Sequence, residues 1–149
     1  MHMMDMRSET TTAFGISATL SGTNASAGNI VDLTDYAAAT FLYQTGAVTD
    51  AGAAAGFSVE IQESDTTAAA DFTAVADADL VGAESDLDVT SDSTDSVAVG
   101  SIGYIGTKRY VRVVVTGTAS TDAVVNGIWA LQCPRYAPKG DAAANVAAT

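Results

Sequence analysis

Residues 56–63, Gly-Phe-Ser-Val-Glu-Ile-Gln-Glu, alternate regularly between apolar and polar side chains. Phe57, Val59 and Ile61 take every second position, and polar side chains stand between them. A period of two is typical of a β-strand that buries one face and exposes the other. We therefore predict a strand here, at a sheet with one face toward solvent.

A second strand is predicted over residues 108–116, which are rich in β-branched and aromatic side chains. One face carries Val111, Val113 and Val115, and the other carries Tyr110, Arg112 and Val114. Because both faces contain bulky side chains, we expect both to be at least partly covered.

Weaker strand patterns occur between turns rich in Gly, Asp, Thr and Ser, at residues 12–20, 30–33, 38–45, 72–75, 97–105 and 123–133. In the last of these, Val125, Trp129 and Leu131 can share a face. No apolar period of 3.6 residues is sustained, and the short alanine runs at 37–39 and 51–55 are interpreted as loops. Seven or eight short strands predict an all-β fold, an antiparallel β-sandwich or jelly roll.

Three segments differ from this strand pattern. They are a Met-rich and then Thr-rich arm (1–11), an acidic polar loop (84–96) and a low-complexity, Ala-rich C-terminal tail. None of them can bury enough apolar surface to offset the entropy lost on ordering. The predicted organisation is an N-terminal arm (1–11), one β-sandwich domain (12–138) and a C-terminal tail (139–149).

The composition of the chain limits which covalent links, metal sites and partners this protein can have, and where it is made. The 149 residues include one cysteine, Cys133, which excludes an intramolecular disulfide and a multi-cysteine metal site. Cys133 ends an apolar strand and is interpreted as a buried structural thiol. A net charge of -12 disfavours nucleic acid as a partner. The sequence lacks an apolar run long enough for a signal peptide or a membrane span, so we expect synthesis in a cytoplasm and no membrane partner.

Two pairs of acidic residues are the strongest candidates for catalytic groups. Asp77 with Asp79, and Asp86 with Asp88, are two residues apart, a spacing that puts both carboxylates on one face of a strand. A solvated acidic loop is the favoured interpretation. Calcium binding by the 84–96 loop is an alternative, although the loop lacks the central glycine and final glutamate of an EF-hand. His2 has no second histidine as a partner, and we predict no enzymatic activity and no cofactor.

The basic residues are gathered late in the chain, with no Lys or Arg between Ser8 and Thr107. Lys108, Arg109, Arg112, Arg135 and Lys139 either neutralise carboxylates of their own subunit or meet an acidic edge of another molecule. The methionines of the arm are flexible apolar side chains that can fill a partner's pockets. The predicted interface residues are Met1, Met3, Met4, Met6, Lys108, Arg109, Tyr110, Arg112, Arg135 and Tyr136. Because Arg112 shares a strand face with Tyr110, we expect Arg112, rather than Arg109, to contact a neighbour.

Several stretches taken together resemble the small head-decoration, or cement, proteins of tailed bacteriophages. They are Val-Glu-Ile-Gln-Glu-Ser-Asp (59–65), Phe-Thr-Ala-Val (72–75), Asp-Ala-Asp-Leu-Val-Gly (77–82), Gly-Tyr-Ile-Gly-Thr-Lys-Arg-Tyr-Val-Arg-Val (103–113) and Cys-Pro-Arg-Tyr-Ala-Pro (133–138). The resemblance covers residues 30–138, and its most specific part is 103–112.

The resemblance implies a non-enzymatic virion protein on the capsid surface, which binds the outer shell and stabilises contacts between major capsid proteins. Its implied partners are the major capsid protein and neighbouring copies of itself, in a homo-oligomer or lattice. An alternative is a phage tail or fibre β-domain that binds host-surface glycans. Such a domain needs exposed aromatic side chains, for which Tyr36, Tyr43, Tyr136 and Trp129 are available, although Trp129 fits a core position. A hydrolase with paired aspartates is the third possibility.

Overall fold

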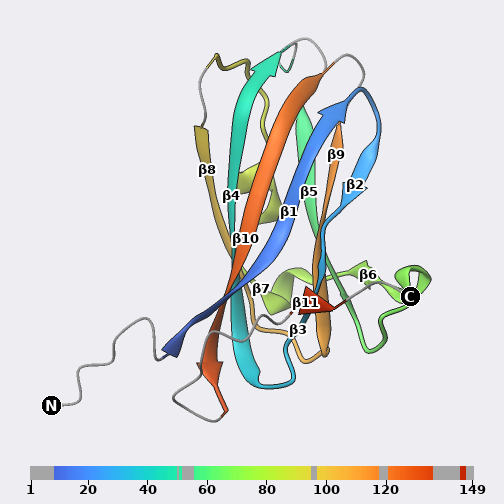
Figure 1. The fold of residues 1–149 in the computed structure, drawn as a ribbon, viewed down its shortest axis with the longest axis vertical. Coiled ribbons are helices and arrows are strands. Elements are labelled where there is room, and N and C mark those ends of the chain that lie inside the picture. Colours follow the sequence, from blue (N-terminus) through green and yellow to red (C-terminus); the bar gives the residue numbers. More distant parts are fainter. Residues whose placement is uncertain are drawn as a thin grey trace, which may run out of the picture.

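In the computed structural model, the chain forms two antiparallel β-sheets packed face to face (Figure 1). The structure describes residues 9–49, 51, 56–94, 97–117, 121–135 and 145–146, with the backbone alone at 97, 98, 145 and 146. The predicted all-β sandwich is confirmed. Within the described part, the named helical segments are 3-10 turns, η1 (Ala69–Asp71), η2 (Asp77–Asp79) and η3 (Glu84–Leu87). No helix in the described ranges has the length and apolarity needed to span a bilayer.

The two sheets draw their strands from the whole length of the chain. Sheet one has the order β1 (Thr11–Ser21), β10 (Asp122–Pro134), β4 (Tyr36–Thr49), β8 (Val97–Tyr104) and β7 (Leu80–Val81). Sheet two has the order β11 (Asn145–Val146), β3 (Ile30–Asp32), β9 (Tyr110–Gly117), β5 (Phe57–Ser64) and β6 (Thr73–Ala74), with β2 (Ala25–Ala27) also paired to β9.

All eight predicted strands are present, with boundaries shifted by up to four residues. The strands missed from the sequence, β2, β7 and β11, are two or three residues long, too short to show an alternation. The loop interpretation of residues 37–39 is wrong, because these alanines belong to β4, where Ala39 is buried against the core. The second alanine run, 51–55, lies outside the described residues except for Ala51.

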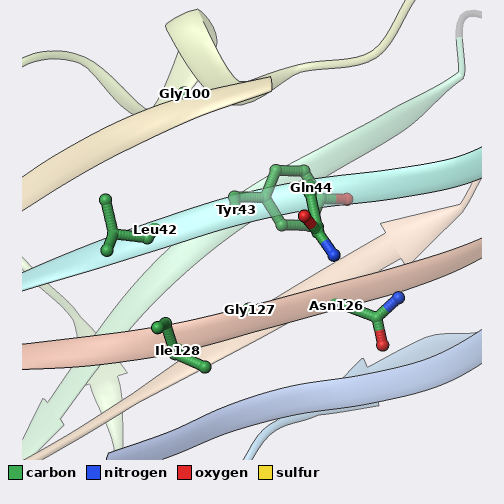
Figure 2. Close-up of a pocket in the computed structure, with 7 residues that line it drawn as sticks. All are labelled: Leu42, Tyr43, Gln44, Gly100, Asn126, Gly127 and Ile128. Carbon is green, nitrogen blue, oxygen red and sulfur yellow. The ribbon is translucent and has the colours of Figure 1, made fainter. Parts of the chain in front are cut away.

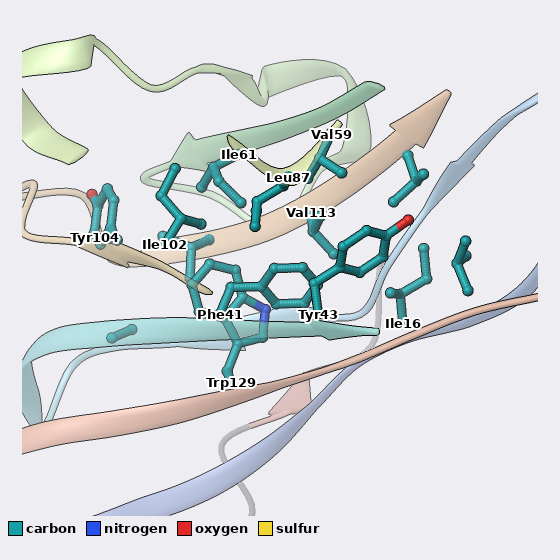
Figure 3. Close-up of a cluster of buried hydrophobic side chains, with 14 of the residues drawn as sticks. Ile16, Phe41, Tyr43, Val59, Ile61, Leu87, Ile102, Tyr104, Val113 and Trp129 are labelled. Carbon is teal, nitrogen blue, oxygen red and sulfur yellow. The ribbon is translucent and has the colours of Figure 1, made fainter. Parts of the chain in front are cut away.

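The core fills the space between the sheets (Figure 3). Phe41 of β4 packs against Trp129 of β10, with ring centroids 5.1 Å apart. The alternation predicted for β5 and β9 is confirmed, because the side chains of both apolar faces are buried, namely Phe57, Val59, Ile61, Val111, Val113 and Val115.

A small second cluster covers part of the outer face of sheet two. Ile30, Phe72 and Tyr110 are buried together there, and the guanidinium of Arg112 lies 4.3 Å from the centroid of the Phe72 ring. The expectation that both faces of β9 are partly covered is therefore confirmed.

The acidic segment, defined here as residues 84–94, packs against the body of the domain. Leu87 is inserted between the sheets and is 1% exposed. The expectation that this loop buries little is wrong for the described residues, because η3 brings this one large apolar side chain into the core.

The acidic segment also hydrogen-bonds along the edge of β5. The backbone N–H of Phe57 donates to the Val89 carbonyl at 3.0 Å, that of Val59 to Asp88 Oδ1 at 3.4 Å, and that of Ile61 to Glu84 Oε1 at 2.5 Å. Three alternate donors of the strand edge therefore have acceptors, two of them carboxylates, where a neighbouring strand would otherwise pair.

Candidate interaction surfaces

Three basic residues line a cleft at the end of the sandwich where β10 ends. The cleft has a volume of about 540 Å³, and its walls come from the β3–β4 connection, the β8–β9 connection and the residue that follows β10. The side chains that define it are Leu33, Tyr36, Ile105, Lys108, Arg109 and Arg135. We call this region the basic end. It brings together three of the six predicted basic and aromatic interface residues.

The β8–β9 turn that forms one wall is fixed by Tyr104. This side chain is 1% exposed, and its hydroxyl donates to Glu63 Oε2 at 2.7 Å and accepts from the Lys108 backbone N–H at 3.1 Å. Gly106 lies so close to the ring that an added Cβ would stand 2.6 Å from the Tyr104 oxygen. Burial, with the nearby Glu63 carboxylate, raises the pKa of Tyr104, so the hydroxyl stays protonated.

Two cations at the basic end pair with carboxylates of their own subunit. Lys108 Nζ contacts Asp65, and the Arg109 guanidinium holds Asp32 with Nε–Oδ1 at 3.1 Å and Nη2–Oδ2 at 2.8 Å. Burial opposes ionisation of Asp32, but hydrogen bonds from Arg109 and Thr34 outweigh it and lower its pKa. Both pairs are exposed, and exposed ion pairs contribute little to stability. A carboxylate from a partner can therefore compete for these cations.

Arg135 differs from these two cations. Its backbone N–H donates to the Asp35 carbonyl at 2.8 Å, and its side chain forms no ion pair within the described residues. Its guanidinium is thus the most available charge at the basic end.

The remaining predicted interface residues lie elsewhere. Arg112 is on the outer face of sheet two, where it donates to Gln62 Oε1 at 2.8 Å and to the Ala69 carbonyl at 3.2 Å. Tyr110 is 8% exposed in the second cluster. Outside the described residues are Met1, Met3, Met4, Met6 and Tyr136.

The acidic pair Asp77 and Asp79 does not have the geometry expected from the sequence, in which both carboxylates share one face of a strand. Asp77 and Asp79 belong to a 3-10 turn and do not share a strand face. Within the described ranges, no three His, Cys, Asp or Glu side chains come close enough to hold a metal ion.

Cys133 and the aromatic side chains also differ from expectation. Cys133 is exposed, with a backbone φ of 53°, so its interpretation as a buried thiol is wrong. The alternation of β10 breaks after Leu131, where both Gln132 and Cys133 are exposed. Of the aromatic residues considered for glycan stacking, three are buried in the core: Tyr36, Tyr43 and Trp129.

The outer face of sheet one is a second surface, and it is almost free of charge. Its five strands contain one charged residue, Asp122, in a chain with 18 acidic and 6 basic residues. Among the described residues, five of the six large apolar side chains that remain exposed are on this sheet: Phe14, Leu42, Val81, Val124 and Ile128. We call it the uncharged face. Asp122 lies at its rim, at the start of β10 and away from the basic end.

Three of these side chains form a row across neighbouring strands. Phe14 of β1 pairs with Ile128 of β10, which pairs with Leu42 of β4, and they are 46%, 43% and 42% exposed. We call them the apolar row. Figure 2 shows Leu42 beside Ile128 and, one row along, Gln44 beside Asn126. Between the two rows runs a groove of about 360 Å³, whose floor includes Gly100 and Gly127.

The uncharged face has a signal in the sequence, namely the absence of charge from four predicted strands. The predicted strands 12–20, 38–45, 97–105 and 123–133 all lack charged residues. Only the strand order shows that these four segments form one sheet. No protein-family model matches the chain, and a search of curated proteins finds no significant match. Function is therefore inferred from the two surfaces.

Proposed function

We propose that the protein is a non-enzymatic virion structural protein, a capsid decoration or cement protein that docks through its basic end. The observation that carries the proposal is the convergence of Lys108, Arg109 and Arg135 on one cleft in a chain of net charge -12. The stretch of most specific resemblance, residues 103–112, forms the end of β8, the turn at this cleft and the start of β9. The same stretch thus supports both the resemblance and the docking surface.

The cleft suits a carboxylate-bearing partner with an apolar neighbour. Guanidinium and ammonium groups bind carboxylates through charge-assisted hydrogen bonds. Ile105 adds an exposed apolar side chain at the same cleft. Electrostatic complementarity of this kind fixes the partner and the orientation more than it sets affinity. We propose the major capsid protein as the partner.

Shell stabilisation then follows from mass action. A protein that binds the assembled shell and not its separated subunits stabilises the shell by an amount set by concentration relative to the dissociation constant. Copies linked to one another add to this effect through multivalency.

A glycan-binding tail or fibre domain is the second candidate. The groove on the uncharged face offers the amide groups of Gln44 and Asn126 beside apolar side chains. Among the described residues, however, Phe14 is the one exposed aromatic side chain, and it lies at the end of the apolar row.

Purified protein added to expanded shells of the major capsid protein from the same source tests the proposal. Co-sedimentation gives occupancy, and the rupture temperature of bare and decorated shells gives stabilisation. We expect decorated shells to rupture at a higher temperature. Equal rupture temperatures would contradict the cement role.

Single substitutions then locate the docking surface. We expect Arg135→Ala to weaken binding at least about tenfold, because a desolvated charge on the partner loses its counterpart. Arg112→Ala, the matched control on sheet two, is expected to bind like wild type because its guanidinium is used within the subunit. The sequence alone predicted Arg112 as the residue that contacts the partner. If Arg135→Ala bound the shell normally and Arg112→Ala did not, that prediction would be supported and the basic end would not be the docking surface.

A further inference from the structure

Charge is distributed unequally between the two sheets. Apart from Asp122, the charged residues belong to the strands of sheet two, to the connections or to the terminal segments, and none of them belongs to a strand of sheet one. A strongly acidic chain has no need to keep one sheet face almost free of charge, and exposed apolar groups gathered on one face mark a contact surface. The uncharged face thus has the composition of an interface core, which is depleted in charged residues.

We propose that two copies of this chain associate through the uncharged face of sheet one, with the apolar row of each copy against the groove of the other. The inference goes beyond the proposed function and does not depend on capsid binding. It also assigns a surface to the contact between neighbouring copies.

Electrostatics permits a second copy as the occupant of this face. Two chains of net charge -12 repel each other, so a stable contact must keep their carboxylates apart. Packed sheets are about 10 Å apart, so two copies joined through sheet one place their charged sheets about 30 Å apart. This separation is several times the Debye length of about 8 Å at physiological salt. Among the surfaces described for this chain, the uncharged face allows such a contact with the least repulsion.

The shape of the face is compatible with self-pairing. In a twofold contact the same patch serves both copies, so a ridge must fit a hollow of the same surface. The apolar row is such a ridge, and the groove between Leu42 and Gln44 lies directly beside it. Gln44 and Asn126 line the far wall with amides that both donate and accept hydrogen bonds, so they can pair across the contact.

The available area is sufficient for a dimer of moderate affinity. Strands β1, β10, β4 and β8 span about 20 Å at about 4.8 Å per strand, and nine residues of a strand extend about 30 Å. The patch therefore offers on the order of 600 Å² per copy, or about 1,200 Å² in total. That area is at the lower end of stable protein interfaces.

A charge placed in the apolar row provides the test. Sedimentation equilibrium on the full chain at about 1–200 μM is expected to show a monomer–dimer equilibrium for wild type. Ile128→Glu is expected to raise the dissociation constant at least about 30-fold, because a carboxylate buried in the contact has no partner. Ile128 is 43% exposed in the monomer, so we expect the variant to fold, as checked by circular dichroism and thermal melting.

Ser58→Glu is the matched control. Ser58 is an exposed position of β5 in sheet two, so this variant also adds one carboxylate to a strand, but away from the uncharged face. We expect this variant to dimerise like wild type. If Ile128→Glu fails to fold, Leu42→Lys at the neighbouring position of the row replaces it, with the same expected outcome.

The salt dependence distinguishes this contact from a charged one. At about 0.01 M NaCl the Debye length of about 30 Å matches the distance between the charged sheets, so raising NaCl to about 0.5 M screens the repulsion between copies and is expected to tighten the dimer. A contact between a basic edge and an acidic edge would instead weaken. A wild-type monomer over the whole concentration range, a dimer that weakens with salt, or equal dimerisation by Ile128→Glu and wild type would each overturn the proposal.

Discussion

Arg112 contributes to the fold of this subunit through three contacts of its guanidinium. It stacks on Phe72 and donates to the Gln62 side chain and to the Ala69 carbonyl, thereby connecting β9 to β5 and to η1. Arg109, three residues earlier, makes an exposed pair with Asp32. The two arginines therefore differ in structural role, although they look alike in sequence.

We expect Arg112→Ala to lower the free energy of unfolding by about 1–2 kcal/mol, since it removes a cation–π contact and hydrogen bonds from a half-buried site. Urea denaturation measures the change. Arg109→Ala, as a control, is expected to change it less. Arg112→Lys should recover only part of the loss, because an ammonium cannot reproduce the planar contacts. Equal effects of the two alanine variants would contradict this assignment.

Glu84 lies where a negative charge is unfavourable, because it is partly buried and close to other carboxylates. Burial raises the pKa of Glu84, and the carboxylates of Glu60, Asp77 and Asp88 raise it further, against the lowering effect of the Ile61 N–H. A raised folded-state pKa means that the native state binds the proton more tightly than the unfolded state does. The contribution of Glu84 to stability therefore falls as pH rises from the ordinary glutamate range through the folded pKa.

Glu84→Gln keeps an oxygen acceptor for the Ile61 N–H and removes the charge. We therefore expect this variant to gain stability relative to wild type between pH 4 and pH 7. Urea midpoints at the two pH values give the comparison. A relative loss at pH 7 would show that the ionised carboxylate stabilises the β5 edge.

At the scale of elements, β5 depends on the acidic segment that runs along its edge. Gly56 precedes β5 with a φ of 69°, and a Cβ there would overlap the Val89 carbonyl oxygen. Gly22 has a similar φ of 62°, but an added Cβ there would meet nothing within 4 Å. Both glycines thus have a left-handed backbone conformation, but only Gly56 has a neighbouring segment where a Cβ would lie.

Gly22→Ala is expected to cost about 1 kcal/mol, the penalty of a left-handed backbone. Gly56→Ala should cost at least about 2 kcal/mol more, because the acidic segment must move away from β5. Chemical denaturation of both variants measures the difference, and equal costs would mean that the segment packs loosely.

The sequence predicted most elements because their patterns are local. The alternation in β5 and β9 and the valine and tryptophan positions of β9 and β10 identify buried faces directly. The position of the acidic segment could not be predicted, because Leu87 and the carboxylates act through partners more than 20 residues away. The two surfaces depend likewise on strand order, which brings the four strands of the uncharged face together from positions far apart in the chain.

At the scale of the whole molecule, like charges are concentrated in the connections between strands, above all in the acidic segment. In a chain of net charge -12, this repulsion destabilises the folded monomer. Salt screens it, so we expect the melting temperature to rise with NaCl between about 0.02 and 0.5 M. About 1 kcal/mol of relieved repulsion corresponds to about 3 °C for a domain of this size.

Scanning calorimetry on Ile128→Glu measures this salt effect in a chain that we expect to be monomeric. At about pH 3.5, where most carboxylates are protonated, the effect should shrink. A melting temperature that falls with salt at neutral pH would show that ion pairs such as Lys108 with Asp65 outweigh the repulsion.

The near absence of charge from the strands of sheet one also makes the charge distribution of the molecule asymmetric. A body with its negative charge on one side rotates in the field of any other negatively charged object, and its neutral side turns forward. When two such molecules diffuse toward each other, their orientation is therefore biased before they touch. This bias shortens the time that two molecules need to reach the correct relative orientation. It favours encounters in which the uncharged faces of the two copies meet first.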